Sequence, residues 1–304
     1  MIAAIPAALD GQRVDKVVAL LTGLPRRVVA ELVDAGAVRV DGRVVTGRSR
    51  RLAEGEELGV EVPVAAAGPP PMAPDPAVVV PVVHADAQVV VVDKPAGLVV
   101  HPGAGQAGGT LVHGLLACFP ELAGVGDPER PGIVHRLDKG TSGLLAVART
   151  ARAYASLVAQ LQARTVERRY EALVWGRVEA DAGLVDAPVG RGQRDPTRMA
   201  VSTAGREART RYQVVARFER PVSVTLVACR LETGRTHQVR VHLAAIGHPL
   251  VGDGGYGGAR SSLPLGRPFL HAGHLAFDHP ADGGRCAFSS PLPADLAELL
   301  AALA

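Results

Sequence analysis

The chain carries, between two apolar runs, the stretch Pro131-Gly132-Ile133-Val134-His135-Arg136-Leu137-Asp138-Lys139-Gly140-Thr141-Ser142-Gly143-Leu144-Leu145. Its one acid, Asp138, is flanked by Arg136 and Lys139, and two adjacent cations favour the ionised carboxylate. The turn-forming residues after it lead into an apolar strand predicted over 144–148. On spacing alone, the stretch fits a surface turn with solvated charges as well as it fits a reactive carboxylate.

The pattern His-Arg-Leu-Asp, two residues, Thr-Ser-Gly-Leu-Leu runs from His135 to Leu145 and resembles the signature loop of the RluA-type pseudouridine synthases. The resemblance implies that Asp138 is the catalytic residue and that the substrate is uridine in RNA. That reaction breaks the bond between base and ribose, turns the base, and rejoins it through carbon. It involves no redox change and no group transfer, so we expect no cofactor.

Two later stretches resemble further motifs of the same family. Arg168-Arg169-Tyr170-Glu171-Ala172-Leu173 lies in an alternating strand predicted over 166–175, and the resemblance implies that Tyr170 meets the target base. The family commonly has Lys where this chain has Arg168. Thr233-Gly234-Arg235-Thr236-His237-Gln238 joins a buried strand, 223–231, to a helix that we expect Thr236 to cap. The resemblance implies that Arg235 pairs with Asp138.

The first 62 residues have a different pattern. Helical spacing predicts helices over 13–22 and 25–35, Asp41-Gly42 predicts a hairpin over 38–45, and a further strand is predicted over 58–62. This pattern resembles an S-four-like RNA-binding domain, named after a protein of the small ribosomal subunit. The resemblance implies that RNA is contacted by Arg26, Arg27, Arg39 and Arg43, with Arg48, Arg50 and Arg51 behind them. Because residues 1–62 hold nine cations and nine anions, a basic surface would need their segregation, and a small adaptor with a mixed surface stays open.

Six prolines between residues 63 and 76 predict an extended linker. Val-rich strands follow over 78–83 and 89–92, and helices are predicted over 111–118, 151–161 and 294–304. We therefore expect an α+β protein with an S-four-like domain at 1–62, a linker at 63–76, and a catalytic domain at 77–304. The resemblance implies that the catalytic domain has a mostly antiparallel sheet with flanking helices.

Composition gives only weak limits on the binding partners and on the cellular compartment. The net charge is +3 with a pI near 9.0, and nearly all cations are Arg, which suits phosphate recognition and a GC-rich genome equally. Three isolated cysteines favour a reducing compartment, and the chain has no run of 18 apolar residues and no secretory signal. We expect a cytoplasmic monomer without a membrane contact. The resemblance to the S-four-like domain points to large-subunit ribosomal RNA as the partner, with Arg136 as a further RNA-binding residue.

Other functions would need other sequence features. A non-catalytic RNA-binding or ribosome-assembly factor needs the basic regions but has no need for Asp138, Tyr170 and Arg235 together. A retaining glycosidase needs two carboxylates about 5 Å apart, and only one convincing acid is present. The histidines do not have metal-site spacing, and the arginines between 191 and 211 fit a solvated face or an RNA contact equally. The route by which Asp138 acts, on the sugar, on the base or by charge stabilisation, stays open.

Overall fold

The computed structural model describes residues 2–24, 26–61, 72–103, 105–193, 195 and 197–303. The chain divides into two compact units, Met1–Met72 and Ala73–Ala304. Each unit has a buried apolar core of its own. Most of the predicted linker lies outside the described residues, so the domain boundaries at 62 and 77 stay predictions.

The smaller unit places two helices against a four-stranded antiparallel sheet with the strand order β1-β4-β2-β3. Its elements are β1 (Ile2–Ala4), the 3-10 helix η1 (Ala7–Leu9), α1 (Val14–Thr22), α2 (Arg26–Asp34), β2 (Val38–Val40), β3 (Arg43–Val44) and β4 (Glu57–Val60). The predicted helices, hairpin and closing strand are confirmed to within two residues at each end. The edge strand β1 is an addition that the sequence pattern did not predict.

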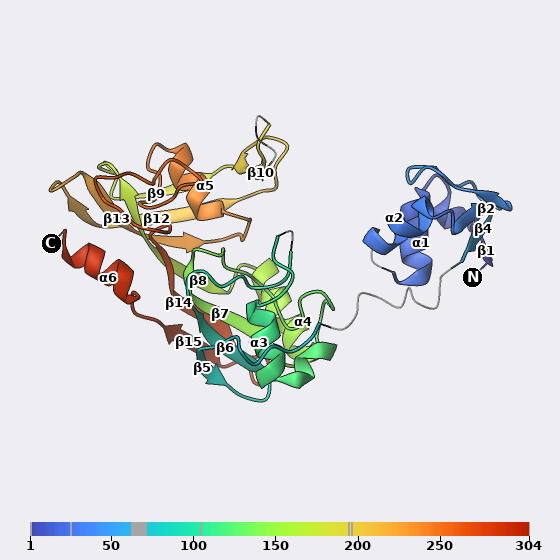
Figure 1. Cartoon of the computed structure of the whole chain (residues 1–304), viewed down its shortest axis with the longest axis horizontal. Coiled ribbons are helices and arrows are strands. Elements are labelled where there is room, and N and C mark those ends of the chain that lie inside the picture. Colours follow the sequence, from blue (N-terminus) through green and yellow to red (C-terminus); the bar gives the residue numbers. More distant parts are fainter. Residues whose placement is uncertain are drawn as a thin grey trace. The chain divides into compact units, whose positions relative to one another are not determined.

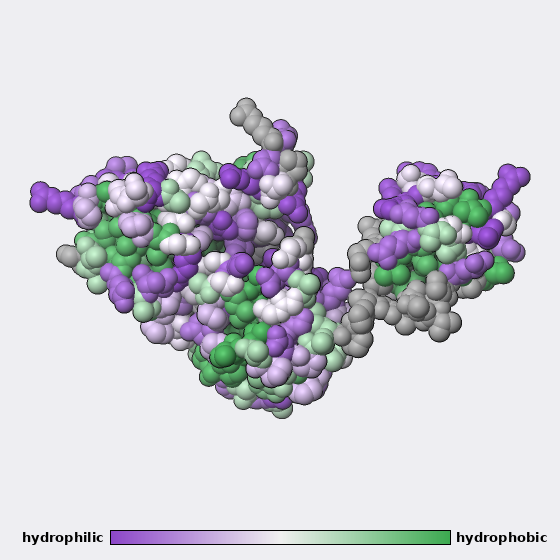
Figure 2. All heavy atoms as spheres, in the orientation of Figure 1, coloured by the Kyte–Doolittle hydropathy of each residue, from purple (hydrophilic) through white to green (hydrophobic). Residues whose placement is uncertain are grey.

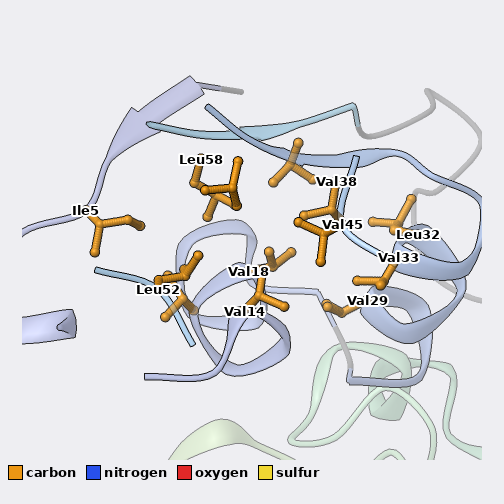
Figure 3. Packing of buried hydrophobic residues seen from close by; sticks show 13 residues of the cluster. Ile5, Val14, Val18, Val29, Leu32, Val33, Val38, Val45, Leu52 and Leu58 are labelled. Carbon is orange, nitrogen blue, oxygen red and sulfur yellow. The ribbon is translucent and has the colours of Figure 1, made fainter. Parts of the chain in front are cut away.

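Aliphatic side chains from both helices and the sheet form the core of this unit. Val14 and Val18 of α1 and Val29 of α2 are completely buried. Figure 3 shows them facing Val38 and Leu58 of the sheet across a layer of Val and Leu side chains. Burying each such side chain contributes about 1.5–3 kcal/mol, so the helical spacing seen in the sequence is the spacing that holds the two layers together.

The hairpin turn has the geometry that its sequence predicts. Asp41 and Gly42 have φ angles of 49° and 75°, both in the left-handed region. Two such residues make the turn whose twist matches the flanking strands. The hairpin presents Arg39 and Arg43 to solvent.

The larger unit is built on a nine-stranded sheet with the order β5-β6-β7-β14-β8-β13-β12-β9, with β15 paired to β14. Only the pair β7 and β14 is parallel, so the predicted mostly antiparallel sheet is confirmed. Its strands are β5 (Val82–Ala85), β6 (Val89–Lys94), β7 (Ser142–Ala148), β8 (Glu167–Trp175), β9 (Ala182–Asp186), β12 (Arg209–Phe218), β13 (Val224–Leu231), β14 (Leu270–Asp278) and β15 (Arg285–Ser289). A separate hairpin consists of β10 (Val189–Arg191) and β11 (Met199–Val201).

Helices flank this sheet (Figure 1). They are α3 (Leu111–Cys118), the 3-10 helix η3 (Pro120–Gly124), α4 (Ala151–Gln162), α5 (Gln238–Ala245) and α6 (Ala294–Ala301). Helix α4 packs on β7 and β14, whereas α5 contacts β11 and β12. One core lies between α4 and the sheet, and a second includes Leu296 of α6 with Trp175 and Phe269. On the face drawn in Figure 2, hydrophilic and hydrophobic residues are interspersed over both units.

The strand predicted over 78–83 is wrong in its first half. Residues 76–77 form a turn and Val78 a bend, and β5 begins only at Val82. Pro81 has no N–H to donate to a sheet, so it suits the residue before the strand. The main-chain oxygen of Pro81 instead accepts the N–H of Asp93 at 2.9 Å.

Gly143 is required by a close approach between strands. It has a φ of 116°, and a Cβ placed there would lie 2.4 Å from the main-chain oxygen of Ala272. Ala272 is its partner in the parallel pair of β7 and β14. Glycine at this position therefore lets the loop that carries Asp138 enter the centre of the sheet.

Candidate active site

Asp138 lies at the wall of a cavity of about 550 Å³ in the larger unit. The cavity is lined by the loop before β7, by α4 and β8, and by the segment from β13 into α5. Tyr170, Arg235, Arg168, His237 and Arg240 share it with Asp138. Segments far apart in the sequence thus bring the three predicted catalytic residues, Asp138, Tyr170 and Arg235, to one cavity.

The loop around Asp138 is tied to the body of the unit on both sides. Nε2 of His135 accepts the N–H of Ala146 at 3.1 Å. Burial, with the positive charge of Arg168, lowers the pKa of His135 to about 3, so the neutral ring can accept this bond. Beyond Asp138, the main-chain oxygen of Lys139 accepts the N–H of Gly97 at 2.7 Å. The carboxylate is therefore presented by a loop held at both ends.

The buried amine of Lys94 strengthens the second of these ties. Its Nζ donates to the main-chain oxygens of Pro95 and Leu98 at 2.9 Å and lies 3.5 Å from that of Lys139. Burial lowers the pKa of Lys94 to about 8, although the charge of Asp138 opposes that shift. Lys94 thus links the turn after β6 to the loop of Asp138.

Arg240 supplies the guanidinium next to Asp138. Its Nη1 donates to Oδ2 of Asp138 at 3.4 Å, while Nε and Nη2 donate to the two carboxylate oxygens of Asp253 at 2.7 and 2.8 Å. The side chain of Asp253 is completely buried. Asp253 therefore holds the guanidinium by two parallel bonds, a geometry that fixes direction as well as charge, and Nη1 remains to donate to Asp138.

The pairing predicted between Arg235 and Asp138 is wrong in this structure. Nε of Arg235 donates instead to the main-chain oxygen of Glu207 at 2.9 Å. Burial, followed by the neighbouring charge of Arg206, lowers the pKa of Arg235. Arg235 is a wall of the cavity, and the sequence signal for Arg240 was its place in the first turn of the helix that follows the same motif.

The start of α5 explains this exchange of arginines. The helix begins at Gln238, and the residue before it is His237, with a φ of 57°, so Thr236 is not the predicted cap. The side chain of Gln238 accepts the main-chain N–H of Arg235 at 3.0 Å and the hydroxyl of Thr233 at 2.7 Å. These two hydrogen bonds hold Arg235 before the start of the helix. The helix then places Arg240 beside Asp138.

His237 is a second neighbour of Asp138, and no role was predicted for it. Its Nε2 lies 3.9 Å from Oδ2 of Asp138, and its Nδ1 is hydrogen-bonded to the hydroxyl of Tyr256 at 2.9 Å. Burial lowers the pKa of His237 against the opposing effect of Asp138. The Tyr256 ring also lies under the guanidinium of Arg240, 5.0 Å away, so one tyrosine supports both neighbours of the carboxylate.

Tyr170 comes from the centre of the sheet, where β8 pairs with β13 and β14. The residue is only 6% exposed and lines the cavity. Burial raises the pKa of Tyr170 to about 12, so its hydroxyl stays protonated at neutral pH. It can take part in proton transfer only by accepting a proton while passing on its own, and its ring offers a stacking surface.

The structure describes only some of the predicted RNA-binding side chains. Arg39 and Arg43 are exposed on the hairpin, and Arg39 lies 3.7 Å from Glu61. The side chains of Arg26 and Arg27 lie outside the described residues. Arg48 and Arg50 form ion pairs with Asp34 and Glu56, which reduces the free positive charge behind the hairpin. In the larger unit, Arg136 is exposed at the cavity.

The described arginines between 191 and 211 belong to the β10–β11 hairpin, to the segment that follows it and to the start of β12. Arg209 and Arg211 form ion pairs with Glu232, and Arg198 with Asp195, as expected for a solvated face. Arg206 instead lines the cavity. Arg194 lies outside the described residues.

In the described parts of the chain, no three His, Cys, Asp or Glu side chains come together as a possible metal site. Three of the histidines considered for a metal have other partners: His242 contacts Thr210, His248 contacts the main-chain oxygen of Trp175, and His271 contacts Ser142. No helix in these segments is long and apolar enough to cross a membrane.

Comparisons with known proteins agree with this arrangement. A model of the RNA pseudouridylate synthase family matches residues 88–245, and a model of the S4 domain matches residues 12–58. An uncharacterized RNA pseudouridine synthase of Bacillus subtilis, YlyB, is 44% identical over 293 residues, covering 95% of this chain and 93% of that protein. Ribosomal large subunit pseudouridine synthase D of Pseudomonas aeruginosa is 44% identical over 314 residues, covering 99% and 95%. The solved structure of human RNA pseudouridylate synthase domain containing 1 has a TM-score of 0.57 and 26% identity, covering 76% of this chain and 97% of that one.

Proposed function

Because this chain belongs to the RNA pseudouridylate synthase family, we propose that it converts uridines of large-subunit ribosomal RNA to pseudouridine with Asp138 as the catalytic carboxylate. The observation that carries the proposal is the pairing of Asp138 with Arg240 inside the cavity that also contains Tyr170. The choice of RNA is supported by the name of the Pseudomonas aeruginosa relative and by the S4 match. Family membership supports an enzyme over the non-catalytic RNA-binding factor.

The reaction first needs the target base out of its stack, which costs a few kcal/mol. Stacking on Tyr170 offsets part of this cost, on the order of 1–3 kcal/mol. The carboxylate of Asp138 then attacks the sugar or the base, or stabilises the positive charge that develops at the anomeric carbon. In each route Arg240 keeps one oxygen of Asp138 in a defined direction.

The base then rejoins through carbon 5, which must lose its proton. Tyr170, or a water molecule that it holds, is the acceptor that we propose. Because Tyr170 stays protonated, the hydroxyl relays a proton and does not act as a phenolate. Arg235 lines the cavity and is proposed to contact the RNA.

The smaller unit is proposed to bind RNA through Arg26, Arg27, Arg39 and Arg43. In the larger unit, Arg136 is proposed to contact RNA at the cavity. Each phosphate that a cation neutralises raises affinity without reading sequence. The cytoplasmic location and the monomeric state expected from the sequence stay predictions.

Mapping of pseudouridines in ribosomal RNA from a deletion strain tests the proposal. Sites in large-subunit RNA should disappear and should return when the parent gene is restored, but not when Asp138→Asn is supplied at the same level. RNA affinity of Asp138→Asn should stay within a few fold, because the change removes a charge and not a surface. An unchanged pseudouridine map, or restoration by Asp138→Asn, would refute the assignment.

A further inference from the structure

Arg168 is a buried cation for which the described residues provide no counter-charge. The residue is 7% exposed, and its Nε is buried without a hydrogen-bond partner. No hydrogen bond or ion pair joins its guanidinium to any other part of the chain that the structure describes. Its neighbours in the sequence and in the cavity are partnered: Arg169 with Glu167, Arg235 with the oxygen of Glu207, and Arg240 with Asp253.

The surroundings of Arg168 make this arrangement costly for the free protein. Burial lowers the pKa of Arg168, the neighbouring hydroxyl of Tyr170 opposes that shift, and the positive charge of Arg235 adds to it. A Cβ added to Gly234 would lie 2.9 Å from Nη1, so the guanidinium lies against the main chain of that glycine. A charge buried without a partner destabilises a fold. Stability of the fold therefore does not account for Arg168.

The position of Arg168 relates it to the reacting base. Arg168 and Tyr170 are two residues apart on β8, so their side chains leave the same face of the sheet. Both line the cavity that contains Asp138. The missing negative charge must therefore come from what the cavity binds, and it must lie beside the ring of Tyr170.

The reaction itself produces such a charge. When the bond between C1′ and N1 breaks, its electron pair stays on the uracil and spreads over N1 and the two carbonyl oxygens. C5 then forms the new bond to C1′ and loses its proton, and N1 gains a proton, so that product and substrate are isomers. A phosphate is charged before and after reaction, whereas the uracil is charged only while it is detached.

We propose that Arg168 stabilises the detached uracil anion during isomerisation. This inference rests on the proposed function and adds a group to it. A preformed cation directed at charge that develops in the transition state accelerates a reaction because the site needs no reorganisation. The cation costs stability in the free enzyme and is neutralised only as the base departs.

The test compares Arg168→Met with Arg168→Lys, and uses Arg169→Met as a matched control on an exposed arginine. Arg168→Met should lower saturating turnover about 100-fold, the loss typical of removing one such donor. RNA affinity should stay within about threefold, and the melting temperature should not fall. Arg168→Lys should recover most of the turnover because it restores the charge, and Arg169→Met should behave like the parent.

RNA with 5-fluorouridine at the target position provides the decisive comparison. Fluorine withdraws electrons and stabilises the base anion, so the loss in Arg168→Met should shrink to about tenfold, measured as disappearance of the 5-fluorouridine nucleoside. Equal losses on both substrates would overturn the inference, as would a lower melting temperature that accounts for the lost turnover. Weaker RNA binding at unchanged turnover, with the log-affinity against log-salt slope flatter by about one, would show a phosphate ligand instead. A parent enzyme that forms no pseudouridine would refute the proposed function itself.

Discussion

Replacing Arg240 with lysine separates charge from geometry at Asp138. In the parent, three N–H groups of one planar guanidinium contact two carboxylates, with distances of 2.7 and 2.8 Å to Asp253 and 3.4 Å to Asp138. A lysine ammonium keeps the charge but cannot present this fork. If only charge matters, Arg240→Lys should behave like the parent.

The structure predicts two separable losses. Asp253 is completely buried and would lose one of its two charged hydrogen bonds, worth roughly 1.5–3 kcal/mol of unfolding free energy. Asp138 would lose its directed contact, and we expect at least about tenfold slower turnover at saturating RNA, roughly 1.4 kcal/mol of barrier. RNA affinity should change little, because the Arg240 side chain is only 12% exposed.

The assay is single-turnover pseudouridine formation at saturating RNA, paired with thermal unfolding of the same samples. Arg235→Lys is the matched control, because Arg235 donates to a main-chain oxygen and not to Asp138. It should lose less than about threefold in turnover. If Arg235→Lys is the slower enzyme and Arg240→Lys matches the parent, the reasoning from the observed pairing is refuted.

Three further changes test other parts of the molecule. Tyr170→Phe should slow turnover more than it weakens binding, whereas Tyr170→Ala should reduce both, measured by turnover and by RNA affinity; a fully active Phe variant would leave only the stacking role. Gly143→Ala should lower the unfolding free energy by at least about 2 kcal/mol, measured by denaturant titration, because its φ is 116° and the added Cβ would lie 2.4 Å from the oxygen of Ala272. A variant as stable as the parent would show that β7 and β14 can move apart at little cost in free energy. A chain starting at Ala77 should keep most of its saturating turnover, while its log-affinity against log-salt slope flattens by roughly 2 to 4 units for three or four lost phosphate contacts; an unchanged slope would remove the RNA-binding role of the smaller unit.

The positions of most elements could be predicted from the sequence because the forces that set them are local. Apolar residues repeat at helical spacing in α1 and α2, and Asp41-Gly42 adopts the left-handed turn that the flanking strands require. Asp138, which the motif from His135 to Leu145 singles out, lines the cavity. The failure at 78–83 has a local cause as well, since Pro81 interrupts a run that is apolar on both sides.

Tertiary structure alone decided which arginine pairs with Asp138. Arg235 lies in the motif and Arg240 five residues after it, and the choice depends on where α5 begins and on the buried carboxylate of Asp253. Tertiary structure also decided that Gly143 lies against Ala272, which is distant in the sequence. It likewise left Nε of Arg168 without a hydrogen-bond partner, because that depends on all the residues packed around it. Periodicity and turn residues report contacts between chain neighbours, whereas ion pairing and burial depend on residues that only the folded chain brings together.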